Sequence, residues 1–256
     1  MKTAFAIAAH PDDIELMMAG TLLLLGEAGY ELHIMNVANG SCGSLTEDAE
    51  IIKARRWEES QEAARVLGAI IHPPITNDIE VFYQDDKIRQ IAAIMRTVAP
   101  DIVLAQSPED YMEDHMNACR LTVTGTFVRG MPNYITSPLV DAIDKDVTVY
   151  HALPWGLQGP LGEPIRAKQY VNIASTLGQK RTALACHKSQ KEWLDETQGL
   201  DSYLDTMEDM SRQVGAASGH FEIAEGWRKH LHLGFCAPDA DPLSDALSDF
   251  IHNETE

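Results

Sequence analysis

Cysteine is scarce in this chain, and its four cysteines (Cys42, Cys119, Cys186 and Cys236) lie far apart without a CxxC pair. This spacing argues against a cysteine-based zinc site or a disulfide framework and suits a reducing compartment. Long apolar runs are also missing, because no stretch approaches the roughly 20 apolar residues of a membrane span. The opening "MKTAFAIAAHPDD" is too short in its apolar part for a signal peptide and has no plausible cleavage site. We therefore expect a cytoplasmic protein.

Positive charge is in short supply too, with 20 Lys and Arg against 39 Asp and Glu and a formal net charge of −19. Such a surface repels phosphate backbones and anionic lipids, so neither nucleic acid nor a membrane is an expected partner. Phosphate-binding motifs are absent, since neither GxGxxG nor GxxxxGK occurs. The segment "NGSCGS" at 39–44 is interpreted as a flexible connection, with the alternative that its glycines let the backbone approach a ligand. These totals leave a small-molecule partner and assembly into a homo-oligomer open.

Strand and helix patterns alternate through the first half of the chain. Short apolar runs predict strands at 3–9, 30–38, 69–72 and 101–105, and amphipathic stretches predict helices at 14–28, 46–67, 85–98 and 116–129. We place the start of the second helix at Thr46 and its end at Gly68. This alternation predicts an α/β, Rossmann-like fold, whose mostly parallel sheet has helices on both faces. With 256 residues the chain suffices for one sizeable core, so we expect a single domain over 1–256.

The second half is less regular, especially from about residue 195. We expect a strand at 147–151, a Gly- and Pro-rich loop at 154–164, a helix at 175–193 and an acidic helical stretch to about residue 214. The tail "DPLSDALSDFIHNETE" is polar and acidic, which predicts that it is loosely held. "HLH" at 230–232 is interpreted as structural, because alternate residues of a strand share one face in many cores.

Two adjacent carboxylates follow the first predicted strand in "AHPDD", residues 9–13. In open parallel sheets, ligands bind beyond the carboxyl ends of the strands, where this turn is placed. His10 offers an imidazole and Asp13 a carboxylate oxygen, and both groups are metal ligands in proteins. If Asp13 binds a cation, Asp12 remains free as a base. The alternative is that "PDD" only begins the next helix, since Asp is a common N-cap.

A further ligand is expected from "SPEDYMEDHMNACRL", residues 107–121, which follows the strand at 101–105. Its loop is predicted at the same sheet edge, with His115 at the start of a helix. Two histidines and one aspartate would leave an open coordination position, which is typical of catalytic zinc. Zinc lowers the pKa of bound water to about 7, although His/Asp ligation also accepts iron, manganese or cobalt.

Four segments together resemble the LmbE-like, or PIG-L, deacetylase family: "AHPDD", "ARRWEESQEAARVLG", "EDYMEDH" and "KRTALACHKSQ". They lie within about residues 3–195. The resemblance implies a Rossmann-like fold and zinc-dependent hydrolysis of an N-acyl group, usually the N-acetyl group of a glucosamine-type sugar. It matches His10, Asp13 and His115 to the metal ligands and Asp12 to the general base.

The resemblance also places Arg56 near the family's substrate-binding arginine. The alternative for this residue is a surface ion pair with Glu59, one helical turn later. Outside the motifs, Trp155 of "HALPWG" is either an aromatic wall for a sugar ring or a core residue, and Asp78 is expected at the same sheet edge.

The sequence departs from the family at Met112. Many members have a histidine three residues before the third metal ligand, and a thioether can neither protonate a leaving amine nor polarise an oxyanion. Candidates for this role are His187 of "HKSQ", which the family places near the site, and the neighbouring Asp110 and Tyr111, whose hydroxyl can donate to an oxyanion. Alternatively, Asp12 takes a proton from water and returns it to the amine.

The sequence therefore predicts a zinc-dependent hydrolase that removes an N-acyl group from a small, amino-sugar-like molecule. Two alternatives stay open. One is a metal-dependent amidase or other hydrolase of another substrate class with altered acid catalysis, and the other is a non-catalytic sugar-binding protein.

Overall fold

The computed structural model describes residues 1–191, 194 and 203–254. In this part of the chain, an eight-stranded sheet has the order β3-β2-β1-β4-β5-β7-β6-β8. Its strands are β1 (Lys2–Ala8), β2 (Tyr30–Asn36), β3 (Ile70–His72), β4 (Ile102–Ala105), β5 (Thr148–Ala152), β6 (Gln169–Asn172), β7 (Ala224–Lys229) and β8 (Ile251–Asn253). The helices are α1 (Asp13–Met17), α2 (Ala19–Glu27), α3 (Ala49–Leu67), α4 (Asp85–Val98), α5 (Glu113–Phe127), α6 (Leu177–Leu184), α8 (Tyr203–Ser218) and α9 (Pro242–Ala246), with short 3-10 turns at Val128–Gly130 and Trp155–Leu157.

The predicted α/β class is confirmed, because β3, β2, β1, β4 and β5 all pair in parallel. The five predicted strands begin and end within two residues of their predicted bounds, and α4 coincides with its predicted range, whereas β6, β7 and β8 were not predicted. Three helices of the first half differ from the prediction. α5 starts at Glu113 rather than at 116 and ends at Phe127 rather than at 129. The stretch 14–28 is broken at Met18, and α3 starts later than Thr46, because the Asp48 carboxylate accepts the N–H groups of Glu50 and Ile51 and caps the helix there.

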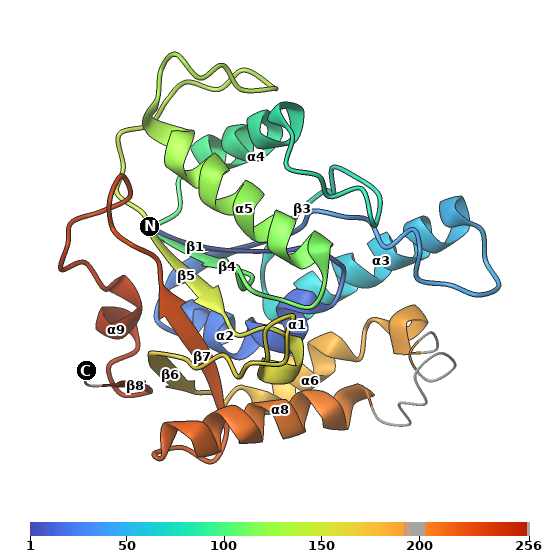
Figure 1. Cartoon of the computed structure of the whole chain (residues 1–256), viewed down its shortest axis with the longest axis vertical. Coiled ribbons are helices and arrows are strands. Elements are labelled where there is room, and N and C mark those ends of the chain that lie inside the picture. The colour runs from blue at the N-terminus through green and yellow to red at the C-terminus, as the bar shows by residue number, and fades with distance from the viewer. Residues whose placement is uncertain (192–193, 195–202, 255–256) are drawn as a thin grey trace.

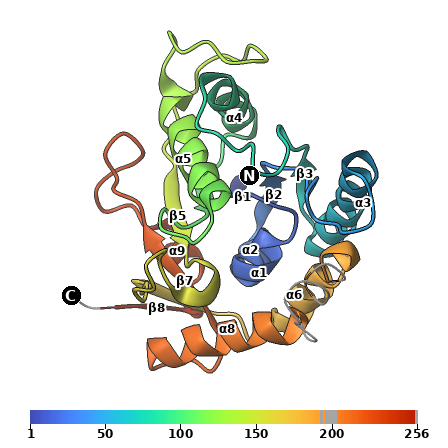
Figure 2. The same cartoon turned by 45° about the vertical axis from the view of Figure 1, so that its right-hand side comes forward.

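Helices cover both faces of the sheet (Figure 1, Figure 2). On one face, Ala6 of β1 lies in a core cluster with Leu22 of α2, and this cluster also includes residues of α1, α3 and α6. On the other face, Phe5 lies with Ile91 of α4 and Leu121 of α5. Alternate residues of a strand point to opposite faces, so the continuous apolar run of β1 belongs to a central strand buried on both sides.

The C-terminal part forms an antiparallel extension of the sheet. β7 pairs antiparallel with both β5 and β6, and β6 pairs antiparallel with β8, while α8 packs against β7. The prediction of a loosely held tail was wrong. Leu243 and Leu247 are buried in the core, and Asp241 caps α9 and accepts a hydrogen bond from Tyr150. These few apolar side chains anchor an otherwise polar segment.

The helix predicted at 175–193 is interrupted. α6 ends at Leu184, residues 185–187 leave the helical path, and helical structure resumes at 188–191. Residues 192–193 and 195–202, which the predicted helices include, lie outside the described residues. α8 continues past the predicted end near 214, to Ser218. Within the described ranges, no helix combines the length and apolar character that a membrane span requires.

Candidate metal centre

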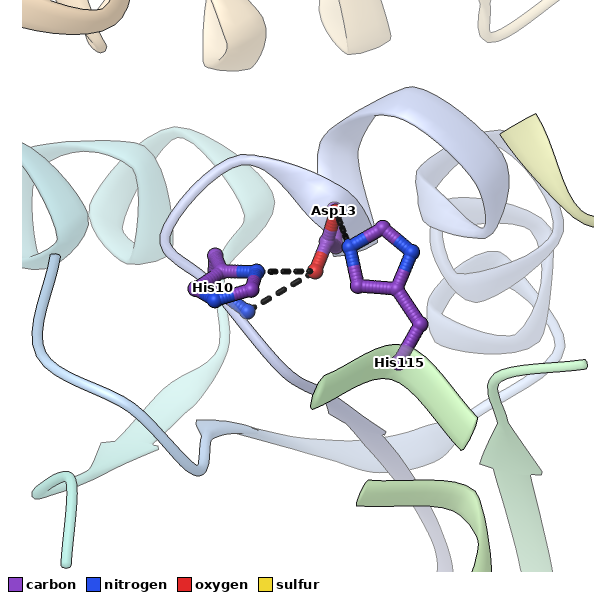
Figure 3. Close-up of side chains that lie close together, drawn as sticks. All are labelled: His10, Asp13 and His115. Atoms are coloured by element: carbon purple, nitrogen blue, oxygen red, sulfur yellow. Dashed lines mark hydrogen bonds and ion pairs between the residues drawn. The ribbon is translucent and has the colours of Figure 1, made fainter. Parts of the chain in front are cut away.

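Two loops meet at the carboxyl ends of the neighbouring parallel strands β1 and β4. The turn after β1 carries His10 and Asp13, and the first turn of α5 carries His115. Figure 3 shows the two imidazole rings on either side of the carboxylate. His10 Nδ1 lies 3.6 Å from Asp13 Oδ2, and His115 Nε2 lies 3.6 Å from Asp13 Oδ1. One donor atom of each residue lies within 4.8 Å of the others, and all three residues are buried. The structure thus brings the three predicted ligands together.

The Asp13 carboxylate is held in place by its own turn and by the loop after β4. Its Oδ2 atom accepts the backbone N–H of His10 at 2.8 Å and the side-chain amide of Gln106 at 3.0 Å. The amide oxygen of Gln106 in turn accepts the N–H of Ala9. Gln106 therefore ties the turn after β1 to the loop after β4.

Two outer carboxylates orient the imidazole rings. His10 Nε2 lies 3.1 Å from Asp114 Oδ2, and His115 Nδ1 lies 2.9 Å from Asp110 Oδ1. The other ring nitrogen of each histidine, Nδ1 of His10 and Nε2 of His115, faces Asp13. These two nitrogens are available to a metal ion. Such carboxylates select the tautomer and the ring orientation of metal-binding histidines. The sequence analysis did not single out Asp114, and it considered Asp110 only as a substitute for the histidine that is missing at Met112. Their signal is a carboxylate on each side of Met112 in "EDYMEDH".

The electrostatics of the cluster favour a positive charge. Burial lowers the pKa of His10, but its contacts with Asp114 and Asp13 outweigh burial and raise the pKa to about 10. Burial also opposes the shift at His115, whose pKa is raised mainly by Asp13 and Asp110. The pKa of Asp13 is lowered despite burial, because both histidines stabilise its charge. Two imidazole nitrogens and a carboxylate oxygen in such a field fit a divalent cation, and the donor set suits catalytic zinc.

Asp12 is buried beside the three predicted ligands and adopts a left-handed backbone conformation with φ of 113°. Its Oδ2 atom accepts a hydrogen bond of 2.5 Å from Tyr203 of α8, and Arg56 Nη2 lies 3.9 Å from Oδ1. Burial raises the pKa of Asp12 to about 6, although Arg56 opposes this shift. Near neutral pH the carboxylate is therefore ionised and close to the range in which a general base works well.

Arg56 does not form the surface pair with Glu59 that we considered. Its side chain is buried, with the residue 2% exposed, and its Nη2 atom donates to the carbonyl oxygen of Pro11 at 2.6 Å. Glu59 instead accepts hydrogen bonds from the backbone N–H and hydroxyl of Ser189. Arg56 thus faces the "HPDD" turn from α3, and its predicted contact with a substrate stays a prediction.

The segment 39–44 is built into the site, so its interpretation as a flexible connection was wrong. The Asp78 carboxylate accepts the N–H groups of Gly40 at 2.7 Å and of Cys42 at 2.9 Å. Gly40 has φ of +80°, and a Cβ atom there would lie 2.4 Å from Arg56 Cδ. Glycine is needed both for this backbone conformation and for the close approach to Arg56.

His187 lies in the break that follows α6, where the residue is only 1% exposed. Its Nε2 atom lies 3.4 Å from Glu15 Oε2. Burial lowers the pKa of His187, but Glu15 and Asp12 raise it overall. The ring contributes nothing to the lining of the cavity that contains His10, Asp13 and His115. The structure therefore places His187 where it acts on the charge of Asp12 rather than on a substrate in that cavity.

A cavity of about 370 Å³ opens in front of the three predicted ligands. Tyr111 lies at its rim, 60% exposed, with its ring edge-on to His115 at a centroid distance of 5.5 Å. Met112, Trp155 and Tyr203 also line it. The remaining lining residues are Asp12, Leu16, Met17, Cys42, Gly43, Arg56, Asp78, Ile79, Gln106, Asp110, Leu153, Gln190 and Leu194. Sequence reasoning missed Tyr203, which lies 191 positions beyond Asp12 and carries no motif.

The comparisons with known proteins agree with this arrangement. Residues 5–125 match the family model "PIG-L: GlcNAc-PI de-N-acetylase", and they include all three predicted ligands, Asp12 and Arg56. This chain carries a PIG-L, or LmbE-like, domain over these residues, which confirms the family resemblance there.

Two curated relatives cover most of the chain. Diacetylchitobiose deacetylase of Thermococcus kodakarensis is 28% identical over 240 residues, which are 89% of this chain and 83% of the relative. 4-Oxalmesaconate hydratase of Pseudomonas putida is 28% identical over 199 residues, 74% of each chain.

Solved structures share the fold. The 4-carboxy-2-hydroxymuconate hydratase GalB of Pseudomonas putida superposes with a TM-score of 0.75 at 23% identity, covering 90% of this chain and 96% of that one. N,N'-diacetylchitobiose deacetylase of Pyrococcus horikoshii gives 0.73 at 22% identity, covering 94% and 88%. At such identities the likeness establishes the fold alone.

Proposed function

We propose that this protein is a metal-dependent hydrolase that removes an N-acyl group, most simply N-acetyl, from a small amino-sugar-like substrate. The observation that carries the proposal is the buried turn that presents Asp13 to two imidazoles and Asp12 to the same cavity. The PIG-L domain over residues 5–125 and the relative named a diacetylchitobiose deacetylase support this choice of reaction.

His10, Asp13 and His115 would hold the cation, with zinc favoured by the donor set. A divalent cation bound there supplies Lewis-acid chemistry, polarising an acyl oxygen and making water acidic near neutral pH. Asp110 and Asp114 keep the two imidazoles in the orientation that this requires. Outer carboxylates of this kind also raise the affinity of the histidines for a metal.

Asp12 is the proposed general base. Its pKa of about 6 leaves it ionised at pH 7, and the hydrogen bond from Tyr203 fixes the carboxylate by its Oδ2 atom. Once protonated, Asp12 can return the proton to the leaving nitrogen, because one carboxylate can serve both steps in turn. In this scheme Asp12 protonates the leaving amine, which is the role of the histidine that Met112 replaces.

Arg56 and Tyr111 are the proposed contacts for the substrate. Arg56 brings a cation to the cavity wall beside the turn, and the phenol of Tyr111 is an O–H donor at the rim. Donors directed at developing negative charge stabilise the oxyanion that forms during acyl transfer. Trp155 offers an aromatic surface against which a sugar ring can pack.

The test is release of free amine from N-acetylglucosamine and diacetylchitobiose by zinc-loaded protein, with bound metal measured on the same sample. Release that is lost in Asp12→Asn but kept in Asp48→Asn supports the proposal, because Asp48 only caps α3 and Asn caps equally well. Bound metal without release from a broad panel of N-acylated sugars contradicts it. Protein that binds no metal indicates the non-catalytic alternative.

Met112 favours a second candidate, the addition of water to a substrate that has no leaving amine. Hydration of an activated double bond needs no acid at the position of the missing histidine, and one relative is named 4-oxalmesaconate hydratase. Met112→His separates the candidates. If the variant turns over acetylated amino sugars much faster than the parent does, the site is a weakened deacetylase site. If the parent turns over 4-oxalmesaconate and the variant does so more slowly, the reaction is hydration. Loss of turnover of another amide indicates the amidase alternative.

A further inference from the structure

A second cavity, of about 360 Å³, lies apart from the candidate metal centre and shares no lining residue with it. Its walls come from α5, the end of β5, the end of β7 and the turn that follows β7. These elements lie beside one another in both views of the fold (Figure 1, Figure 2). The cavity therefore sits where the parallel part of the sheet meets its antiparallel extension.

Its charge is opposite to that of the chain as a whole. Arg120, Arg228 and Lys229 line it, and none of the described lining residues is a carboxylate. His151 and His230 add no charge near neutral pH, because burial lowers the pKa of His151 to about 4 and also lowers that of His230. In a protein with a net charge of −19, a cavity with this lining attracts anions locally.

Two of these cations retain unused binding capacity. Nη1 of Arg228 donates to Glu109 and Nη2 donates to the hydroxyl of Ser107, both at 2.9 Å. The Nε–H of Arg228 is buried without a hydrogen-bond partner among the described residues. Buried donors in native proteins normally have partners, so an unpaired one indicates a missing acceptor. Arg120 lies over the ring of Tyr83 at 4.5 Å and forms no ion pair within the described residues.

Apolar groups also line this cavity. Pro108, Val123, Leu231 and the ring of Tyr83 form the walls between the charged groups. Leu231 is 63% exposed, so its side chain offers apolar surface at this cavity. A bare inorganic anion would leave these surfaces wet, whereas an organic anion with an apolar body would cover them.

We propose that this cavity binds a small organic carboxylate with an apolar body, its charged end on Arg120 and Arg228 and its body against Val123 and Leu231. Guanidinium groups bind carboxylates with charge-assisted and often bidentate hydrogen bonds, which a neutral amide cannot replace. The site is independent of the proposed hydrolysis, because neither arginine lines the cavity of the metal centre.

Benzoate is the probe, with benzamide as its neutral isostere, and binding to metal-loaded protein is measured by calorimetry and ligand-observed NMR. We expect roughly millimolar affinity for benzoate, which is reasonable for a ligand of this size. Benzamide should bind at least about tenfold more weakly, because it lacks the charge. Equal binding of the two probes, or no benzoate binding at about 10 mM, overturns the proposal.

Variants assign the binding to this cavity rather than to the metal. Arg120→Gln should weaken benzoate at least about fivefold, and Leu231→Glu should weaken it similarly by placing a carboxylate at the site. Both residues are exposed, so both variants are expected to fold. Arg166→Gln, an exposed arginine outside either cavity, is the matched control and should bind like the parent. Unchanged affinity in Arg120→Gln and Leu231→Glu places benzoate elsewhere and overturns the proposal.

Discussion

The parallel part of the sheet and its antiparallel extension contribute to the candidate site in different ways. In the parallel part, the loops after β1 and β4 carry compact motifs, and strand pairing alone brings His10, Asp13 and His115 to one edge. The C-terminal part contributes Tyr203 and Trp155, which belong to no motif. The first region supplies the proposed metal chemistry, and the second buries and holds the residue proposed to move the proton.

The sharpest test of this division is removal of a ligand from the parallel part. His115→Ala takes away one of three donors, and we expect bound metal to fall below about a tenth of the parent level, with activity lost. Metal analysis of the purified protein measures this directly. His220→Ala, an exposed histidine on the C-terminal side, is the control. Full metal content in His115→Ala would mean that the proposed centre is wrong.

Asp12→Asn should keep the metal and lose the reaction. An amide cannot accept the proton, so we expect kcat/KM to fall on the order of 10³-fold while metal content stays at the parent level. Steady-state kinetics with metal analysis on one preparation separates the two effects. Asp48→Asn is again the matched control. Near-parental activity in Asp12→Asn would assign the base to another residue.

The outer carboxylates of the parallel part are expected to tune metal affinity. Asp110→Asn removes the charge that orients His115, and Asp114→Asn does the same for His10. Each change should weaken metal binding about 10- to 100-fold. Competition with a chelator of known affinity gives the constants. Glu113→Gln alters an exposed carboxylate between them and should leave the affinity unchanged.

His151 lies in β5, where the parallel part of the sheet meets the antiparallel extension. We expect the titration of this histidine to make the stability of the protein depend on pH. Its pKa is about 4 when folded and near 6.5 when unfolded. The unfolded chain binds the proton first, so stability is present above pH 6.5 and is lost as the pH falls toward 4. This histidine alone should cost roughly 2 kcal/mol of unfolding free energy between pH 7 and pH 5.

Urea unfolding of the parent and of His151→Gln at both pH values measures this contribution. The variant should lose less stability on acidification than the parent does, whatever its stability at pH 7. An identical pH dependence in the two proteins would show that His151 is not held neutral at the junction.

The smallest expected effect concerns the contribution of the C-terminal part to Asp12. Tyr203→Phe removes the hydrogen bond to Asp12 Oδ2, and we expect kcat/KM to fall about fivefold to tenfold. Because that bond lowers the pKa of Asp12, the acid limb of the pH–rate profile should also move to higher pH. Tyr170→Phe, which removes a hydrogen bond to Glu254, controls for loss of a tyrosine hydroxyl. If activity fell but the pH–rate profile did not shift, Tyr203 would contribute to packing and not to the pKa of Asp12.

Much of the parallel part could be predicted because its signals are local. Apolar runs such as "TAFAIA" and "DIVLA" predict buried strands, and the rule that ligands bind beyond their carboxyl ends placed "AHPDD" and "EDYMEDH" at one edge. The predictions failed where a distant partner decides the outcome. Residues 39–44 look flexible until Asp78 binds their backbone N–H groups, and the polar tail looks loose until Leu243 and Leu247 reach the core.

The sequence by itself determined the α/β class, the PIG-L motifs and the residue types that would bind a metal, because hydrophobic periodicity and motif spacing are properties of neighbouring residues. Only the tertiary structure decided that Arg56 is buried against the "HPDD" turn, that His187 lies outside the cavity, and that Tyr203 reaches Asp12. These contacts depend on how separate elements pack. A hydrogen bond between residues 191 positions apart leaves no local pattern in the chain.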